Sequence, residues 1–183
     1  MTPGAKPDWP IETERLVLRP YIEDDLDGLY ALQSDPEVVR WLYEEPRTRA
    51  ETRDALDRKM QNSLEHEGDW MSAAVTLDGT FVGDAAVHWV SEEHKTAEVG
   101  YMIDPRYQGR GFASEAIRPL IDWAFAQGFH RVIGRLELRN VASGRVLEKL
   151  GMRKEGVFIE NEWVKGEWQS EALYAILDRE WQR

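Results

Sequence analysis

The chain has 183 residues, 42% of them hydrophobic and 31% charged, which fits one globular domain with a sizeable core. Its formal net charge of −11 disfavours nucleic acid and anionic membranes as partners, because an acidic surface repels phosphate. The absence of cysteine excludes disulfides, thiolate metal sites and a cysteine nucleophile. An acidic surface attracts cationic ligands instead, with solubility alone as the alternative reason for the charge.

The sequence also gives expectations about metals and location. The four histidines, at positions 66, 88, 94 and 130, show no metal-ligand spacing, so we expect no bound metal. No apolar run approaches the length needed to cross a membrane. The first ten residues are rich in proline and lack the apolar stretch of a signal peptide. We therefore expect a cytoplasmic protein that uses neither membrane nor nucleic acid as a partner.

The first third of the chain is expected to be mostly helical. Residues 1–14 read as a flexible lead-in and residues 15–183 as a single domain, whose first strand covers residues 15–20. Helical segments then start at three capping signals, which are Asp24-Asp25, Asp35-Pro36 and the capping box from Thr48 to Glu51.

The remaining chain alternates strand and helix patterns. Asp78-Gly79 is a strong signal for a two-residue hairpin turn. Pro119 lies inside the first of the later helices and predicts a kink near Glu115. The expected strands are 71–77, 80–90, 96–103, 131–138, 152–160 and 168–177, and the expected helices are 111–127 and 141–150.

In chain order these segments read β-α-α-β-β-β-α-β-α-β-β. This order predicts an α+β fold, a mixed and mostly antiparallel sheet flanked by helices. Strand 96–103, helix 111–127 and strand 131–138 form one parallel crossover, which should be right-handed. Ligands of such units bind at the carboxyl ends of the strands, so the chemistry is expected there.

A glycine-containing segment lies between strand 96–103 and helix 111–127. It consists of Gln108, Gly109, Arg110, Gly111, Phe112 and Ala113, followed by Ser114. Glycines allow a tight backbone turn, and the helix N-terminus adds unpaired N–H groups, so the segment predicts a pyrophosphate site. A dinucleotide-binding loop is one alternative, although Ser114 replaces its third glycine and only one βαβ unit exists. A plain structural turn is the other.

Several motifs in order resemble the GNAT superfamily of N-acetyltransferases. Gln108, Gly111 and Ala113 match its Q/R-x-x-G-x-G/A pattern. The segments 97–105, 140–143 and 148–152 resemble the strand before this pattern and the second signature after it. The opening segment 14–20 is similar to the branch of ribosomal-protein N-terminal (alanine or serine) acetyltransferases. The resemblance covers about residues 12–177 and implies the acyl-CoA N-acyltransferase fold.

The resemblance implies acetyl-CoA as co-substrate and assigns residues to it. The pantetheine arm would insert between strands 96–103 and 131–138, and bond main-chain groups near Tyr101, Met102 and Ile103. Backbone N–H groups from Gln108 to Ala113, with Ser114 beside them, would hold the pyrophosphate. The side-chain amide of Asn140 would reach the pantetheine.

Candidate catalytic residues also come from the resemblance. Glu98 matches a family glutamate and would act as the base, with a surface ion pair as the alternative. Many family members carry tyrosine where this chain has Leu147, which cannot donate a proton. Ser143 could donate one to the thiolate, or it could only bind the cofactor, and water could protonate the thiolate instead. His88 and His94 are expected to be ordinary sheet and turn residues.

The resemblance also indicates which segments border the acceptor site. By analogy, the loop between the last two strands borders it, and carboxylates with tryptophan rings suit a cation. Packing or a homodimer contact is the alternative for the tryptophans. The residues expected to contact the acceptor are Trp41, Glu98, Glu160, Glu162 and Trp163, with Glu44, Glu45 and Trp168 nearby.

Two functions follow from this reading. The first is an acetyl-CoA-dependent N-acetyltransferase that acts by direct transfer on a primary amine, with no covalent enzyme intermediate. The acceptor would be a protein N-terminus, a polyamine or aminoglycoside, or a small metabolite, and we expect it to be cationic. The second is a catalytically silent acyl-CoA-binding sensor or docking module.

Overall fold

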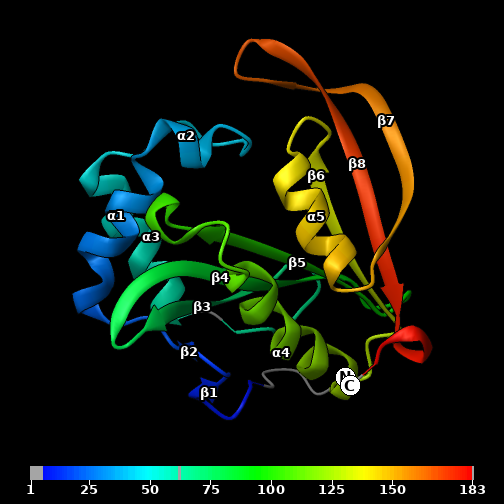
Figure 1. The fold of residues 1–183 in the computed structure, drawn as a ribbon, viewed down its shortest axis with the longest axis horizontal. Helices are drawn as coiled ribbons and strands as arrows, with labels where there is room; N and C mark the ends of the chain where they lie inside the picture. The colour runs from blue at the N-terminus through cyan, green and yellow to red at the C-terminus, as the bar shows by residue number, and fades with distance from the viewer. Residues whose placement is uncertain (1–5, 62, 183) are drawn as a thin grey trace.

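A computed structural model describes residues 6–61 and 63–182 and shows one continuous sheet flanked by helices (Figure 1). The eight strands lie in the order β1-β2-β3-β4-β5-β6-β8-β7. The strands are β1 (Ile11–Glu12), β2 (Val17–Arg19), β3 (Trp70–Leu77), β4 (Thr80–Ser91), β5 (Thr96–Ile103), β6 (Arg131–Glu137), β7 (Arg153–Val164) and β8 (Glu167–Leu177). The α-helices are α1 (Leu26–Gln33), α2 (Pro36–Val39), α3 (Arg49–Gln61), α4 (Phe112–Ala126) and α5 (Val141–Lys149).

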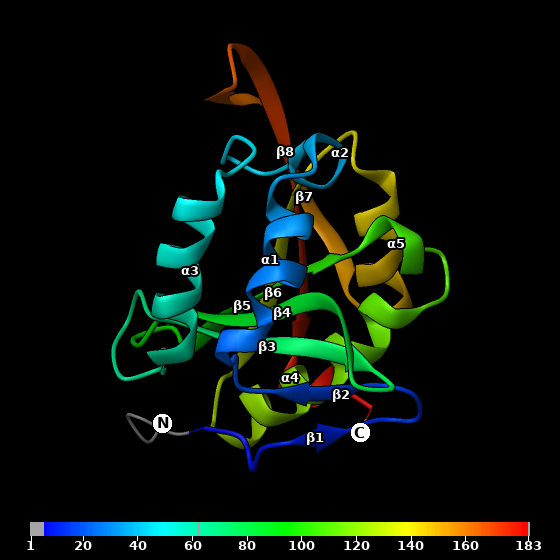
Figure 2. The same ribbon diagram turned by 90° about the vertical axis from the view of Figure 1, so that its left-hand side faces the viewer.

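The two faces of the sheet carry separate cores. Successive strand residues point to opposite faces, so Ala73 and Val75 join one core while Ala74 joins the other. The larger core forms under α4, whose Ile117 and Ile121 are fully buried. The smaller core lies under α1 and α3, which pack side by side in Figure 2. The helices therefore leave one end of the sheet, near β6, open on the α1–α3 side.

The predicted fold class is confirmed, including the parallel crossover from β5 through α4 to β6 and the antiparallel pairing elsewhere. The hairpin predicted at Asp78-Gly79 joins β3 and β4. Helix α4 continues through Pro119. No helix in the described part of the chain is long and apolar enough to cross a membrane.

Three details differ from the prediction. Residues 11–12 lie in the predicted lead-in but pair with β2, so the ordered chain starts earlier than residue 15; residues 1–5 lie outside the described residues. Three α-helices precede β3, as the three capping signals predict, whereas the predicted order of elements counts only two of them.

The third difference concerns the last hairpin, which is longer than predicted. Strands β7 and β8 meet at a tight turn formed by Lys165 and Gly166, both of which have positive φ angles. Trp163 and Trp168, expected in a loop, are paired across this hairpin, with ring centroids 5.3 Å apart. The hairpin extends beyond the rest of the molecule in Figure 1 (orange to red).

Candidate active site between strands β5 and β6

Strands β5 and β6 separate soon after they begin to pair. Their parallel ladder has three paired positions, and the last of them joins Glu98 to Ile133. Beyond it, β5 continues to pair with β4 as far as Ile103, and β6 continues to pair with β8 as far as Glu137. Residues 99–103 of β5 and 134–137 of β6 are therefore paired on their outer edges only. On the edges that face each other, they form no ladder in the described chain. An extended ligand can bond there as an added strand would.

The glycine segment lies at the start of α4, next to this separation. Gly111 is the N-cap residue of α4 with a φ of 83°, and Gly109 has a φ of 73°. These left-handed backbone conformations strain other residues, which explains the two glycines. The side chain of Gln108 donates a hydrogen bond to the carbonyl of Ile103 (2.8 Å), which ties the segment to the end of β5.

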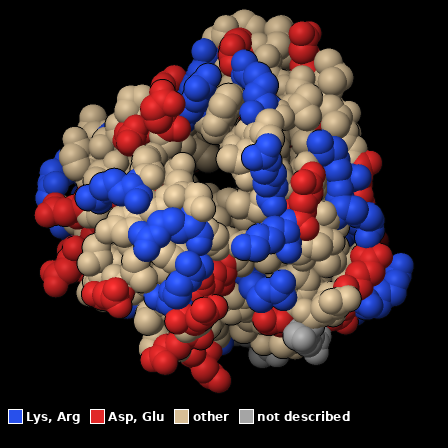
Figure 3. Space-filling model, in the orientation of Figure 1, with Lys and Arg blue, Asp and Glu red and all other residues tan. Residues whose placement is uncertain are grey.

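Cationic side chains surround Gly111. A Cβ atom added there would lie 3.3 Å from Lys149 Nζ and 3.6 Å from Arg15 Nη2. Figure 3 shows lysine and arginine side chains gathered around a hollow on this face of the molecule, although the chain carries a net charge of −11. The cations and the helix N-terminus together favour an anion at this position. Phe112, Ala113 and Ser114 form the first turn of α4 here, and Arg110 lies within the segment.

The start of α5 closes the other side of the separation. Asn140 caps α5, because its Oδ1 accepts a hydrogen bond from the N–H of Ser143 (3.1 Å). This cap orients the side chain of Asn140, whose amide nitrogen can donate to a ligand. The hydroxyl groups of Ser143 and Tyr101 lie 2.7 Å apart, and the Tyr101 hydroxyl also contacts the Ser143 carbonyl (3.0 Å).

Tyr101 and Leu147 have different capacities for proton transfer. Burial raises the pKa of Tyr101 to about 12, so its phenol stays neutral at ordinary pH. Leu147 is fully buried against Gly134, where an added Cβ would lie 2.7 Å from the leucine. Leu147, at the position where the family resemblance leads us to expect tyrosine, is therefore a packing residue in this chain.

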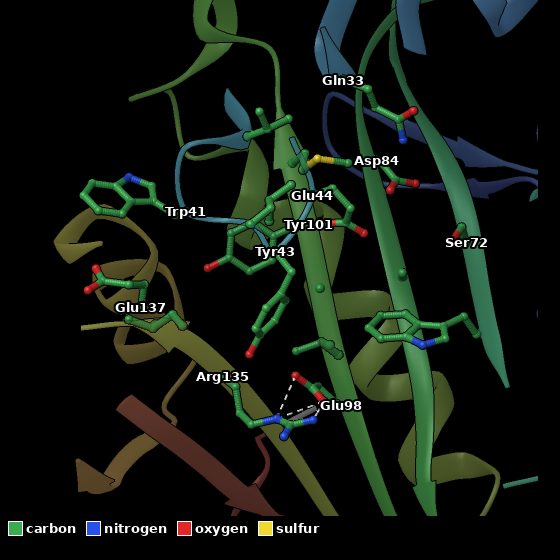
Figure 4. Close-up of a pocket in the computed structure, with 18 of the residues that line it drawn as sticks. Gln33, Trp41, Tyr43, Glu44, Ser72, Asp84, Glu98, Tyr101, Arg135 and Glu137 are labelled. Atoms are coloured by element: carbon green, nitrogen blue, oxygen red, sulfur yellow. Dashed lines mark hydrogen bonds and ion pairs between the residues drawn. The ribbon is translucent and has the colours of Figure 1, made fainter. Parts of the chain in front are cut away.

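A cavity of about 650 Å³ lies on the opposite face of the sheet, beneath the segment after α2 (Figure 4). Its lining includes residues 98–102 of β5 and 135–137 of β6, where the two strands have separated. Ala86 and Gly100 leave room above the sheet, and Trp70 stacks on His88 beside them, with ring centroids 4.4 Å apart. The lining carboxylates are Glu44, Glu45, Asp84, Glu98, Glu137, Glu162 and Glu171, and the cations are Arg47, Arg58, Lys59 and Arg135. We call this space the acidic cavity.

Glu98 lies in the acidic cavity and is 8% exposed. Its carboxylate accepts a hydrogen bond from Arg135 Nη2 (2.7 Å), and Nδ1 of His88 is 3.6 Å away. Burial alone would raise the pKa of Glu98, but the contacts with His88 and Arg135 outweigh burial and lower it. The carboxylate therefore stays ionised near neutral pH, which suits holding a cation better than taking up a proton.

The other residues expected at the acceptor site fall into two groups. Trp41 and Glu162 line the acidic cavity, together with Glu98. Glu160 and Trp163 lie outside its lining; Trp163 is 62% exposed on the projecting hairpin. A β-bulge between Phe158 and Glu162 interrupts the regular alternation of β7, so Glu160 and Glu162 need not share a face. Trp163 follows Glu162 directly and faces the other side by ordinary strand alternation.

Sequence reasoning missed three cavity residues. They are Arg135, the partner of Glu98; Tyr43, whose hydroxyl donates a hydrogen bond to Glu162 (2.5 Å); and Glu171 on β8. Figure 4 shows Arg135 and Glu98 directed toward each other, with the Tyr43 hydroxyl pointing to the same region. One feature of the sequence could have indicated Arg135: it lies in a predicted strand, four residues after Arg131 and therefore on the same face.

The Arg135–Glu98 pair leads to a prediction about pH. In Arg135→Met, burial should dominate and raise the pKa of Glu98, so the carboxylate would lose its charge as the pH falls through this higher value. The amine itself must also be deprotonated, so log(kcat/KM) for a fixed amine should rise with a slope of one in the wild type. Below the new pKa of Glu98 the slope should steepen toward two. Arg131→Met, on the same strand but paired with Glu155, is the control. A wild-type slope in Arg135→Met would show that the charge of Glu98 is irrelevant.

Comparison with known proteins defines the class. The description "Acetyltransferase (GNAT) domain" matches residues 15–153. A crystal structure of a GNAT-family acetyltransferase from Bacillus anthracis shares 32% identity, covers 93% of this chain and 99% of its own, and superposes with a TM-score of 0.82. The chain is an N-acetyltransferase, and it belongs to the GNAT family.

Named relatives differ in what their names say about substrate. The uncharacterised N-acetyltransferase YnaD of Bacillus subtilis is 30% identical over 93% of this chain and 98% of its own length. The putative ribosomal N-acetyltransferase YdaF of Bacillus subtilis is 30% identical over 61% of this chain and 62% of its own. The spermidine N(1)-acetyltransferase of Escherichia coli is 24% identical over 90% of this chain and 87% of its own.

Proposed function

We propose that this enzyme transfers the acetyl group of acetyl-CoA directly to a primary amine held in the acidic cavity. The observation that carries the proposal is the separation of β5 and β6. On one face it adjoins the cation-flanked start of α4, and on the other it forms part of the acidic cavity. A thioester in this separation would have its phosphates beside Gly111 and its acetyl group in the cavity.

The chemistry follows from these positions. The amine nitrogen bonds to the carbonyl carbon of the thioester, the carbon–sulfur bond breaks, and one amine proton ends on the thiol of CoA. Main-chain groups of Tyr101, Met102 and Ile103 hold the pantetheine and polarise the carbonyl. Glu98 holds the incoming ammonium close to Gly100 until water carries off its proton. The Ser143 hydroxyl, linked to Tyr101, gives its proton to the thiolate and regains one that water carries from the amine nitrogen, with water as the alternative donor.

The acceptor is a cationic amine. Seven carboxylates and four cations line the cavity, so it carries an excess of negative charge. The name of one relative, a spermidine N(1)-acetyltransferase, gives a polyamine as a substrate of this kind. Membership of an acetyltransferase family and relatives named as acetyltransferases favour catalysis over a silent acyl-CoA-binding module, although Leu147 cannot donate a proton. Release of free CoA with a panel of amines separates the two, because a silent module releases none.

Salt dependence provides a test of the cationic acceptor. Exposed charges are screened over ~10 Å at 0.1 M salt. The KM of the best amine should therefore rise with ionic strength, while kcat changes little. The KM for acetyl-CoA, determined in the same assays, should change less, because backbone N–H groups make many of its contacts. A KM that is the same at low and high salt would mean that the acidic surface serves solubility alone.

A further inference from the structure

Most carboxylates of the acidic cavity already have a cationic partner. Glu44 pairs with Arg47, Asp84 with Lys59, Glu98 with Arg135, and Glu137 with Arg139, all within 4 Å. Among the described residues, three lining carboxylates have no such partner: Glu45, Glu162 and Glu171. Glu45 is exposed to solvent, so water can satisfy it. The other two lie together on the β7–β8 hairpin.

Glu171 is the unusual member of this pair. It is 8% exposed, and it lines the cavity from the middle of β8. Its backbone N–H bonds to Asn161, but no described residue donates a hydrogen bond to its carboxylate or forms an ion pair with it. Its carboxylate oxygens are not sealed off from solvent but face the cavity, where a cationic ligand can replace the water that solvates them. Burial raises the pKa of Glu171; the positive charge of Arg135 opposes this rise, and the negative charges of Glu162 and Glu98 add to it.

Glu162 faces the same space. It lies opposite Gln169 in the β7–β8 ladder, so Glu162 and Glu171 are diagonal neighbours on one face of the hairpin. Such residues are about 7–8 Å apart, close enough for both carboxylates to contact one ammonium group. Tyr43 approaches from the opposite wall and donates its hydroxyl to Glu162 (2.5 Å), which places an acceptor oxygen lone pair beside the carboxylates.

We propose that Glu162 and Glu171, with Tyr43, form a subsite for a second, non-reacting ammonium group of the acceptor. The inference rests on the proposed function and narrows it: the acceptor is an alkyl diamine or polyamine, with its reacting nitrogen beside Glu98 and its chain along apolar lining such as Val39 and Leu42. A metal ion is the less suitable ligand. The described residues contain no group of three or more His, Asp or Glu arranged to hold one, and Arg135 lies among the carboxylates.

The test compares two amines of equal chain length, 1,4-diaminobutane and butylamine. The wild type should show a higher kcat/KM for the diamine, and Glu171→Gln should reduce this preference by about tenfold or more, through KM. Its activity with butylamine, which has no second ammonium group, should fall much less. Glu162→Gln should reduce the preference less, because Glu162 is only half-buried. If Glu171→Gln does not fold, the Glu162→Gln variant serves as the test. Glu93→Gln, an exposed residue in the β4–β5 turn, makes the same charge change and should alter nothing.

The outcomes separate the two proposals. If the variants keep the wild-type preference, or if butylamine is as good a substrate as the diamine, the subsite is wrong while the proposed function stands. The subsite is also wrong if other amines are acetylated and the diamine is not. If no amine releases CoA, the proposed function fails and the subsite with it. Calorimetry with 1,4-diaminobutane adds a readout without turnover, in which Glu171→Gln should bind the diamine more weakly by a similar factor.

Discussion

Gly111→Asp is expected to abolish measurable acetyl-CoA binding while the fold persists. The new side chain would project toward Lys149 and Arg15, whose nitrogens lie 3.3 and 3.6 Å from the added Cβ position. Its carboxylate would pair with these cations and occupy the place of the pyrophosphate, and its charge would repel what remains. Calorimetry with acetyl-CoA measures the loss, and circular dichroism confirms the fold.

Two variants isolate the cause of this effect. Gly128→Asp introduces the same residue at the other end of α4, where φ is also positive (89°) and an added Cβ meets nothing within 4 Å. It should bind acetyl-CoA normally, which shows that backbone strain alone is not responsible. Gly111→Asn adds the bulk without the charge and should retain part of the affinity. Wild-type affinity in Gly111→Asp would remove this segment from the cofactor site.

Glu98→Gln is expected to lower turnover by about 10²-fold, because the reacting nitrogen loses the group that positions it, with nearly unchanged affinity for acetyl-CoA. The substitution keeps the size of the side chain but removes the charge that holds the ammonium group and leaves Arg135 without its partner. Single-turnover measurements with saturating acetyl-CoA, together with calorimetry, separate the chemical step from cofactor binding. Ser143→Ala should lose less, because water can replace a hydroxyl donor.

The matched control for this prediction is Glu93→Gln, which removes one charge far from the cavity. It should keep full turnover. Glu98→Asp, which retains the charge on a shorter side chain, should recover part of the rate if the charge is what matters. Equal rates in the wild type and Glu98→Gln would leave Glu98 with no part in catalysis.

The cofactor side of the site could be predicted from the sequence because its determinants are local. Gly109 and Gly111 need positive φ angles, and a helix starts directly after them, so six consecutive residues define the segment. The position of Glu98 was also predictable, since alternation along β5 directs it away from Ala97 and Val99. These features need no knowledge of which strands are neighbours.

The acceptor side of the site depends on how distant strands are aligned with each other, which no short stretch of sequence indicates. Arg135 reaches Glu98 because β5 and β6 are parallel and pair only at their first residues. Tyr43 meets Glu162 across 119 positions of sequence. Glu171 is buried beside Glu162 because of a bulge in β7, which the sequence does not mark. Glu160 and Trp163 were expected in the cavity but lie outside its lining. The bulge changes the direction of Glu160, and Trp163 belongs to a strand that continues past the predicted end at residue 160.

The most direct test of the account is the mass of the product formed from each member of a broad amine panel. The wild-type enzyme is incubated with acetyl-CoA and mono-, di- and polyamines, basic peptides and acidic amino acids, and every amine is analysed by mass spectrometry. We expect one acetyl group on di- or polycationic amines, none on acidic amino acids, and none on any amine with Gly111→Asp. Acetylation of neutral or anionic amines in preference to cationic ones would contradict the account, as would an acetylated product that still forms with Gly111→Asp.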